Sequence, residues 1–306
     1  MTRRVARERW DGLGPRASDF ETECPVLRAG AGPAPWGRSA VRDGYAVAAV
    51  VWVALVATGL VVGQNDARAY WLHRLPDLYT SPAYDASFGF YYSPAFAQAI
   101  APLTALPLPA FLAIWASLSL AIIGWLSGRW AVLALLFPPV ALELWYGNVN
   151  ILFALVAVAG LRCPGLWALP LLTKVTPGVG ILWFAARREW RSLGIAVGTA
   201  AAIALVSAIL APDLWRQWIG LLLTNADVPV GLPVGPLWLR LPIAALLVTW
   251  GARTDRRWVI PVAMLLGSPR IWLASGAVLL AVPALAFRSV SYLDVDATVV
   301  PRHGDG

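Results

Sequence analysis

Residues 45–63 read YAVAAVVWVALVATGLVVG, and the polar motif Asn65-Asp66-Ala67-Arg68-Ala69-Tyr70 follows almost at once. A helix of about twenty apolar residues is long enough to cross a bilayer core of about 30 Å, so the first stretch predicts a membrane span. Arginines precede this span and few follow it. The positive-inside rule therefore directs its C-terminal end, and Asp66 with it, to the extracytoplasmic side.

The composition of the whole chain is typical of a polytopic membrane protein. Of the 306 residues, 59% are hydrophobic and only 13% are charged, and the mean hydropathy is +0.66. Soluble domains of this length do not carry so many long apolar runs. The net charge of +7 fits loops that face anionic lipid. No basic cluster interleaved with aromatic residues indicates binding of nucleic acid.

The distribution of polar residues divides the chain into three regions. Residues 1–43 are rich in Arg, Gly and Pro without a helical period, and they predict a disordered cytoplasmic arm. Residues 44–288 hold the apolar runs and predict a transmembrane domain, and residues 289–306 predict a polar cytoplasmic tail. We therefore expect an all-α, multi-pass protein of the plasma membrane.

The apolar runs predict about ten spans. The expected spans are 45–63, 109–127, 130–146, 149–162, 164–173, 175–186, 193–211, 236–251, 258–267 and 271–288. The run at 93–107 would reverse every later span if it crossed the bilayer, so we expect a re-entrant or juxtamembrane helix there. Several of the spans are too short to cross alone. Short helices of that kind are tolerated where they line a protein-enclosed or wet cavity.

The polar residues inside this apolar frame are candidate site residues. Asp66 lies at the mouth of the bundle in a loop rich in tyrosine, an arrangement that suits sugar transfer at a membrane surface. The alternative is that Asp66 only caps a short interfacial helix. Asn148 and Asn150 interrupt two apolar runs with amides that need hydrogen-bond partners. The alternative for this pair is a helix–helix turn in which Asn148 is the N-cap.

Lys174 is the only lysine among the 24 basic residues, and it lies between two apolar runs. An ammonium at membrane depth costs several kcal/mol unless it finds a partner, so such residues usually serve a functional site. The alternative is a lysine that extends to the headgroup layer. Arg240 and Arg270 are similar cases, and the three cations together could hold an anionic group such as a phosphodiester. Glu143 could pair with one of them.

Several motifs in this order resemble glycosyltransferase family 87, the polyprenol-phosphate-mannose-dependent mannosyltransferases of the GT-C membrane fold found in actinobacteria. The resemblance runs from about residue 45 to residue 288. It rests on Asp66-x-x-x-Tyr70, Asp77-Leu78-Tyr79, Phe90-Tyr91-Tyr92-Ser93-Pro94, Ala101-Pro102-Leu103, Gly147-Asn148-Val149-Asn150, Lys174-Val175-Thr176-Pro177 followed by Arg187-Arg188-Glu189-Trp190, and Ser268-Pro269-Arg270-Ile271-Trp272. After Trp272 the sequence departs from the family, which commonly has a histidine or further aromatic residues there.

The resemblance implies a GT-C-type bundle that transfers a sugar, with mannose expected, from a polyprenyl-phosphate donor to a lipid or cell-envelope glycan acceptor. Asp66 would act as the general base of an inverting reaction, without a cofactor and without a bound metal. Lys174, Arg270 and Arg240 would bind the donor phosphate. The implied substrate contacts are Tyr70, Asp77, Tyr79, Tyr92, Asn148, Asn150 and Trp272.

Two other functions fit parts of the same pattern. A transporter of lipids or small molecules also uses broken helices and a charged residue near the midplane of the membrane. No inverted internal repeat is visible in the sequence, however, and the long aromatic loop after residue 63 is atypical of transporters. A non-catalytic member of the family, acting as a membrane scaffold, is the second alternative.

Overall fold

The computed structural model describes residues 39–61, 63–73, 75, 78–79, 89–224 and 231–287. The chain divides into two units, residues 1–32 and 33–306, and every described residue belongs to the second. All regular elements in these ranges are helices, as the sequence predicts. Most of the predicted arm and the whole predicted tail lie outside the described residues, although the first helix already begins at Ser39.

The helices are short and numerous. In chain order they are α1 (Ser39–Ala57), α2 (Asn65–Leu72), α3 (Pro94–Thr104), α4 (Leu108–Ser127), η3 (Gly128–Trp130), α5 (Ala131–Leu136), α6 (Pro138–Tyr146), α7 (Asn150–Ala159), η4 (Pro164–Trp167), α8 (Ala168–Thr173), η5 (Thr176–Ile181), α9 (Leu182–Ala186), α10 (Trp190–Leu210), α11 (Pro212–Thr224), α12 (Leu237–Arg253), α13 (Val259–Leu266), η6 (Leu273–Leu280) and α14 (Ala281–Phe287), where η denotes a 3₁₀-helix.

Within the described residues, two helical segments are long and apolar enough to cross a bilayer. They are Leu108–Leu136, which joins α4, η3 and α5, and Trp190–Leu210, which is α10. The chain direction bends by 118° between α6 and α7. A third span results if these two helices form one broken crossing. The predicted number of about ten spans is therefore not confirmed.

Proline and glycine account for much of this difference. The predicted span 130–146 is divided because α5 ends at Leu136 and a new helix begins at Pro138, which has no N–H to continue the hydrogen bonding. The predicted span 45–63 stops early, since α1 ends at Ala57 and Gly59 follows at φ 73°. The helix in 93–107, α3, has 11 residues and is about 16 Å long. Its re-entrant placement stays a prediction.

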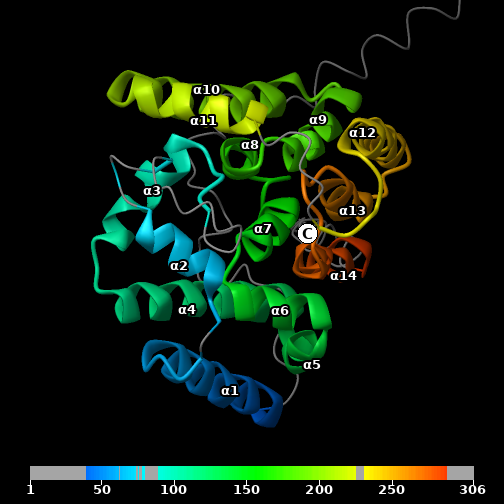
Figure 1. Ribbon diagram of the computed structural model, residues 1–306. Coiled ribbons are helices and arrows are strands. Elements are labelled where there is room, and N and C mark those ends of the chain that lie inside the picture. Colours follow the sequence, from blue (N-terminus) through cyan, green and yellow to red (C-terminus); the bar gives the residue numbers. More distant parts are fainter. Residues whose placement is uncertain are drawn as a thin grey trace, which may run out of the picture. The chain divides into compact units, whose positions relative to one another are not determined.

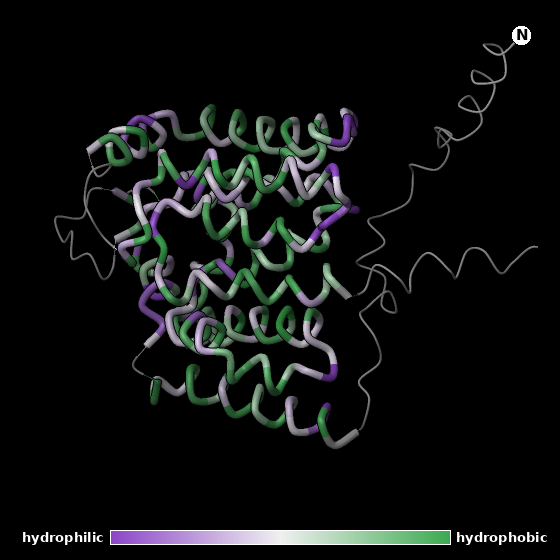
Figure 2. The backbone as a smooth tube through the Cα atoms, turned by 90° about the vertical axis from the view of Figure 1, so that its right-hand side faces the viewer, coloured by the Kyte–Doolittle hydropathy of each residue, from purple (hydrophilic) through white to green (hydrophobic). Residues whose placement is uncertain are grey.

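The helices pack through an apolar core. Helix α1 packs against α4, both α6 and α7 pack against η6, and α10 packs against η4, α8 and α3 (Figure 1). Figure 2 shows that apolar residues follow most of the helices, whereas polar residues gather mainly at helix ends and turns. Helix α10 carries exposed apolar side chains such as Leu205, Ile209 and Leu210. A continuous apolar surface of this kind predicts contact with lipid.

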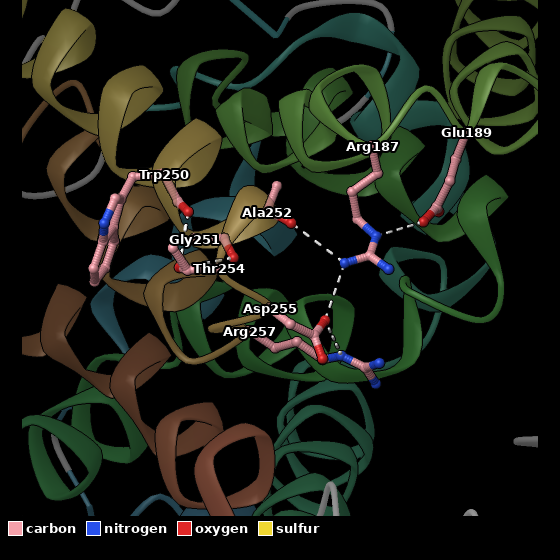
Figure 3. A network of polar contacts seen from close by, with 8 residues as sticks. All are labelled: Arg187, Glu189, Trp250, Gly251, Ala252, Thr254, Asp255 and Arg257. Atoms are coloured by element: carbon pink, nitrogen blue, oxygen red, sulfur yellow. Dashed lines mark hydrogen bonds and ion pairs between the residues drawn. The ribbon is translucent and has the colours of Figure 1, made fainter.

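Two arginine-containing loops, one at Arg187 and one at Asp255–Arg257, lie next to each other (Figure 3). Arg187 Nη1 lies 3.0 Å from Asp255 Oδ1 and also donates to the carbonyl of Ala252, while Arg187 Nε lies 2.8 Å from Glu189 Oε1. Exposed ion pairs contribute little stability, so the main effect of these contacts is to hold the two loops beside each other. Arg187 directly follows the helical segment Thr176–Ala186. The network therefore lies at the C-terminal end of this segment, about 20 Å from Thr176 at its other end.

Candidate active site

The sharp bend between α6 and α7 is the structural basis of the site. Gly147 ends α6 at φ 70°, the left-handed region that favours glycine. A Cβ atom at this position would lie 2.6 Å from Gln64 Oε1 and 2.7 Å from the Cβ of Ala67. Glycine is therefore required both by the backbone conformation and by the close approach of α2.

Replacing this glycine tests the bend. We expect Gly147→Ala to destabilise the protein by roughly 2 kcal/mol or more, because it adds both a left-handed alanine and a steric overlap. The matched control is Gly198→Ala within α10, where a Cβ would meet nothing within 4 Å and a small gain in helix propensity is expected. Apparent melting temperatures in one detergent measure both effects. Equal melting temperatures for the two variants would contradict the assignment.

Helix α2 carries Asp66 and is fixed to the bend by Gln64. The backbone N–H of Gln64 donates to the carbonyl of Trp145 at 2.5 Å, and its side-chain amide donates to the carbonyl of Leu144. Gln64 is the N-cap of α2 and makes no side-chain cap bond, so Asp66 is not the helix cap that the alternative interpretation required. Asp66 lies in the first turn, where the helix dipole favours a carboxylate.

The amide of Asn148 joins the predicted base to the predicted cation. Its Nδ2 donates to Asp66 Oδ2 at 2.8 Å, and its Oδ1 accepts from Lys174 Nζ at 3.1 Å. The same oxygen accepts from the hydroxyl of Tyr92 at 3.2 Å and from the backbone N–H of Val149 at 2.7 Å. Because Val149 is the N-cap of α7, the alternative in which Asn148 only caps that helix is wrong.

Asn150 makes the second contact to Lys174. Its Oδ1 accepts from Lys174 Nζ at 3.2 Å, while its backbone N–H and its Nδ2 donate to the two carboxylate oxygens of Glu143 at 2.6 and 2.9 Å. The rings of Tyr92 and Phe153 lie 6.0 and 5.7 Å from the ammonium. The Lys174 side chain therefore points to polar partners of the bend, which contradicts the alternative of a lysine reaching for headgroups.

The environment of Asp66 changes its proton affinity. Burial raises the pKa of the Asp66 carboxyl above its ordinary value, while the hydrogen bond from Asn148 and the charge of Lys174 act in the opposite direction. A raised pKa makes this carboxylate a stronger base than an exposed aspartate. It also means that the carboxylate becomes protonated at a higher pH as the medium is acidified.

The predicted tyrosines form a buried layer around the site. The hydroxyl of Tyr70 donates to that of Tyr92 at 2.8 Å, and the ring of Tyr70 packs edge-on against Tyr92, Phe96 and Trp115. Tyr70 is 1% exposed and Tyr92 is 7% exposed. Both rings are buried and support the residues around the site, and their contact with substrate stays a prediction. Tyr79 is half-buried and donates to the carbonyl of Tyr92.

Arg240 and Arg270 belong to a second cluster. The Arg240 guanidinium donates to four backbone carbonyls, those of Gly235, Leu266, Ser268 and Pro269, at 2.9–3.1 Å. Four of its five N–H groups are thus already used, and the predicted role of Arg240 in binding phosphate stays a prediction. The turn that it holds presents Arg270, whose guanidinium lies 5.0 Å from the ring centroid of Tyr91.

This second cluster lies close to the loop of Lys174. A Cβ at Gly267 would lie 2.7 Å from the carbonyl oxygen of Thr176, so the turn before Arg270 contacts the backbone two residues after Lys174. Trp272 follows the turn and is 51% exposed, which leaves its ring available for a substrate. Asp77 lies outside the described residues.

A cavity of about 240 Å³ lies between α2 and α3 and is lined by Tyr70, His73, Ile100 and Thr104 among others, but by neither Asp66 nor Lys174. Across the described part of the chain, no group of three or more His, Cys, Asp or Glu side chains is arranged to hold a metal ion.

Three residues that position the site were not predicted. Gln64 ties α2 to α6, Trp115 donates from Nε1 to the carbonyl of Gly147 at 2.8 Å, and Ser93 caps α3 while donating to the carbonyl of Leu172. In the sequence, Gln64 and Ser93 are single polar residues beside a helix start, and Trp115 is one of many aromatic residues. Only the Ser93-Pro94 pair carries a recognisable signal, that of a helix N-terminus.

The same arrangement of motifs can be compared with known proteins. No curated protein and no solved structure matches the chain. The model of glycosyltransferase family 87 matches residues 90–300, which include the bend with Asn148 and Asn150, Lys174 and the turn that presents Arg270. Asp66 precedes the matched region, and the hydrogen bond from Asn148 is what joins it to the matched part. With more than half of its length matched, the chain belongs to glycosyltransferase family 87.

Proposed function

We propose that the protein transfers a sugar, mannose, from a polyprenyl-phosphate donor to a lipid or cell-envelope glycan acceptor at the extracytoplasmic side of the plasma membrane. The observation that supports this most directly is that one amide, Asn148, bonds both the Asp66 carboxylate and the Lys174 ammonium. Sugar transfer from a phosphate leaving group needs a base for the acceptor and a cation for the departing phosphate, and this site offers one of each.

The proposed reaction is a single displacement. The Asp66 carboxylate removes the proton from the acceptor hydroxyl while that oxygen attacks the anomeric carbon of the donor. The bond from the anomeric carbon to the phosphate oxygen breaks, and its electron pair leaves with the polyprenyl phosphate. Attack from the opposite side inverts the configuration at the anomeric carbon.

Lys174 is the proposed ligand of the departing phosphate. An ammonium has three N–H donors, and the contacts to Asn148 and Asn150 use two of them. The third is available for a phosphate oxygen, whose developing charge it would stabilise in the transition state. Arg270 is the proposed second cation, because it follows a turn that Arg240 holds and that contacts the backbone of Thr176, two residues after Lys174. Arg240 itself is a positioning residue in this proposal.

The pH dependence of transfer tests the assignment of Asp66. The acid limb of kcat/KM should lie above pH 4, the ordinary range of an aspartate, because activity requires the ionised form and the pKa is raised. Asn148→Leu removes the hydrogen bond that lowers this pKa, so it should move the acid limb to a higher pH. The control Tyr92→Phe removes another donor to Asn148 but leaves the bond to Asp66 intact. An acid limb that stays in place in Asn148→Leu would exclude Asp66 as the titrating base.

The activity itself is tested with membranes that contain the protein and with matched membranes that lack it. Both are supplied with radiolabelled polyprenyl-phosphate-mannose, and the lipid and glycan fractions are separated. We expect a labelled product only in the first preparation, and its anomeric configuration should be the inverse of that of the donor. A product of retained configuration would contradict the single displacement. Uptake of the donor or its release across vesicles without any new glycoside would favour the transporter alternative.

A further inference from the structure

Glu143 is a buried carboxylate that the proposed reaction does not use. It lies on α6 and is 1% exposed, and it forms no salt bridge with any described residue. Both of its oxygens accept hydrogen bonds from Asn150, one from the backbone N–H and one from Nδ2. Two donors that point at two oxygens fit the carboxylate form, which can only accept.

These two bonds fix which way the amide of Asn150 faces. Because Nδ2 is directed to Glu143, Oδ1 is directed to Lys174 Nζ at 3.2 Å. Asp66 orients Asn148 in the same manner, since the Nδ2 of Asn148 faces the carboxylate and its Oδ1 faces the ammonium. Two carboxylates thus act through two amides on a single cation, and neither forms a direct ion pair with it.

We propose that Glu143 is a positioning residue, which orients Asn150 toward Lys174 and supplies negative charge that keeps the ammonium protonated in its buried setting. Burial lowers the pKa of Lys174, and the charges of Glu143 and Asp66 oppose that change. Each carboxylate contacts an amide and not the ammonium, so a third N–H of Lys174 stays available for the phosphate. A carboxylate in direct contact with the ammonium would compete with the phosphate for that N–H. The link to the phosphate rests on the proposed function, whereas the link to Lys174 does not.

The substitution Glu143→Gln gives a specific expectation. The new side-chain oxygen can still accept from the backbone N–H of Asn150, but its NH₂ group then faces Asn150 Nδ2, and two donors cannot bond each other. Asn150 has to rotate its amide, and its NH₂ group then faces the ammonium of Lys174. The double variant Glu143→Gln/Asn150→Asp restores one acceptor for each donor and returns a negative charge next to Lys174.

The chain itself provides the probe, since Lys174 is its only lysine. Reductive methylation of the intact protein, followed peptide by peptide in mass spectrometry, separates Lys174 from the N-terminal amine. The methylation rate plotted against pH has a midpoint that reports the protonation of Lys174 and a plateau that reports its accessibility. The matched control is Glu189→Gln, which alters a half-exposed glutamate of the network in Figure 3.

We expect the midpoint of Glu143→Gln to fall by about one pH unit or more with an unchanged plateau, and the donor KM to rise about tenfold, the effect of losing one hydrogen bond to a charged group. The double variant should return the midpoint at least to the wild-type value but should not fully recover the donor KM, because its new carboxylate contacts the ammonium directly. Glu189→Gln should match the wild type. If Glu143→Gln does not fold, a midpoint at or above the wild-type value in the folded double variant supports the proposal and a lowered midpoint overturns it.

An unchanged midpoint in folded Glu143→Gln would overturn the proposal. Failure of the proposed function looks different, because the methylation midpoint does not depend on any activity. A lowered midpoint with an unaltered donor KM would support the action of Glu143 on Lys174 and would reject the phosphate role of Lys174.

Discussion

Asp66→Asn is expected to reduce sugar transfer by about a hundred- to ten-thousandfold, the range that a general base contributes. The substitution keeps the size of the side chain and an oxygen that can accept from Asn148 Nδ2, so the fold should persist. What it removes is the capacity to take a proton from the acceptor. Single-turnover transfer of labelled mannose from the pre-bound donor measures this step without a contribution from product release.

The control for this variant is Asp213→Asn. Asp213 also lies in the first turn of a helix, α11, but its side chain is 77% exposed and pairs with Arg216 on the same helix. We expect transfer by this variant to equal that of the wild type. Near-normal turnover in Asp66→Asn would remove Asp66 as the base, and Glu143 would then be the next carboxylate to consider.

Lys174→Met should raise the donor KM or lower kcat by about ten- to a hundredfold in total, because a charge-assisted contact to phosphate is worth about 1.5–3 kcal/mol. From the sequence alone, removal of an isolated charge is expected to leave the fold unaffected. The contacts to Asn148 and Asn150 change this expectation, since two amide oxygens lose a donor. A lower melting temperature is therefore expected as well, and the kinetics have to be measured on the monodisperse fraction.

Two companion variants separate the phosphate role from a general loss of charge. Lys174→Arg should recover only part of the activity, because a planar guanidinium does not reproduce the three donors of an ammonium in a fitted site. Arg216→Met removes a cation whose side chain is 75% exposed and should have no effect. Wild-type donor kinetics in folded Lys174→Met would exclude Lys174 from the phosphate site.

The sequence identified the main site residues separately, and the structure shows which of them are in contact. Asp66, Asn148 and Lys174 each attract attention as polar residues in apolar surroundings, where unpaired groups are costly. Their connection through one amide depends on the left-handed glycine at position 147 and on the rotation of the Asn148 side chain. Neither can be deduced from spacing along the chain.

Burial and hydrogen bonding give some of the predicted site residues surroundings that the sequence does not indicate. A tyrosine next to a predicted base is expected to contact substrate, yet Tyr70 is enclosed by Tyr92, Phe96 and Trp115. An intramembrane arginine is expected to bind an anion, yet the Arg240 side chain meets the carbonyls of a turn 26–29 residues later in the chain. Both outcomes depend on tertiary contacts between distant segments.

The helical class was predictable and the number of spans was not. Composition and the length of the apolar runs predict helices, since only helices and closed barrels satisfy the backbone in lipid. Hydropathy does not indicate that α5 ends before Pro138 or that α6 and α7 meet at 118°. The first break lies inside one predicted span, 130–146, and the second joins residues of two predicted spans, 130–146 and 149–162, into one possible crossing.

The most direct test of the central claim, that base and cation are separate groups of one site, is equilibrium binding of radiolabelled polyprenyl-phosphate-mannose to two purified variants. Asp66→Asn should bind the donor with wild-type affinity and fail to transfer it. Lys174→Met should bind the donor about tenfold or more weakly, because it lacks the charge that holds the phosphate. Wild-type donor affinity in Lys174→Met, or an equal loss of affinity in both variants, would contradict the account.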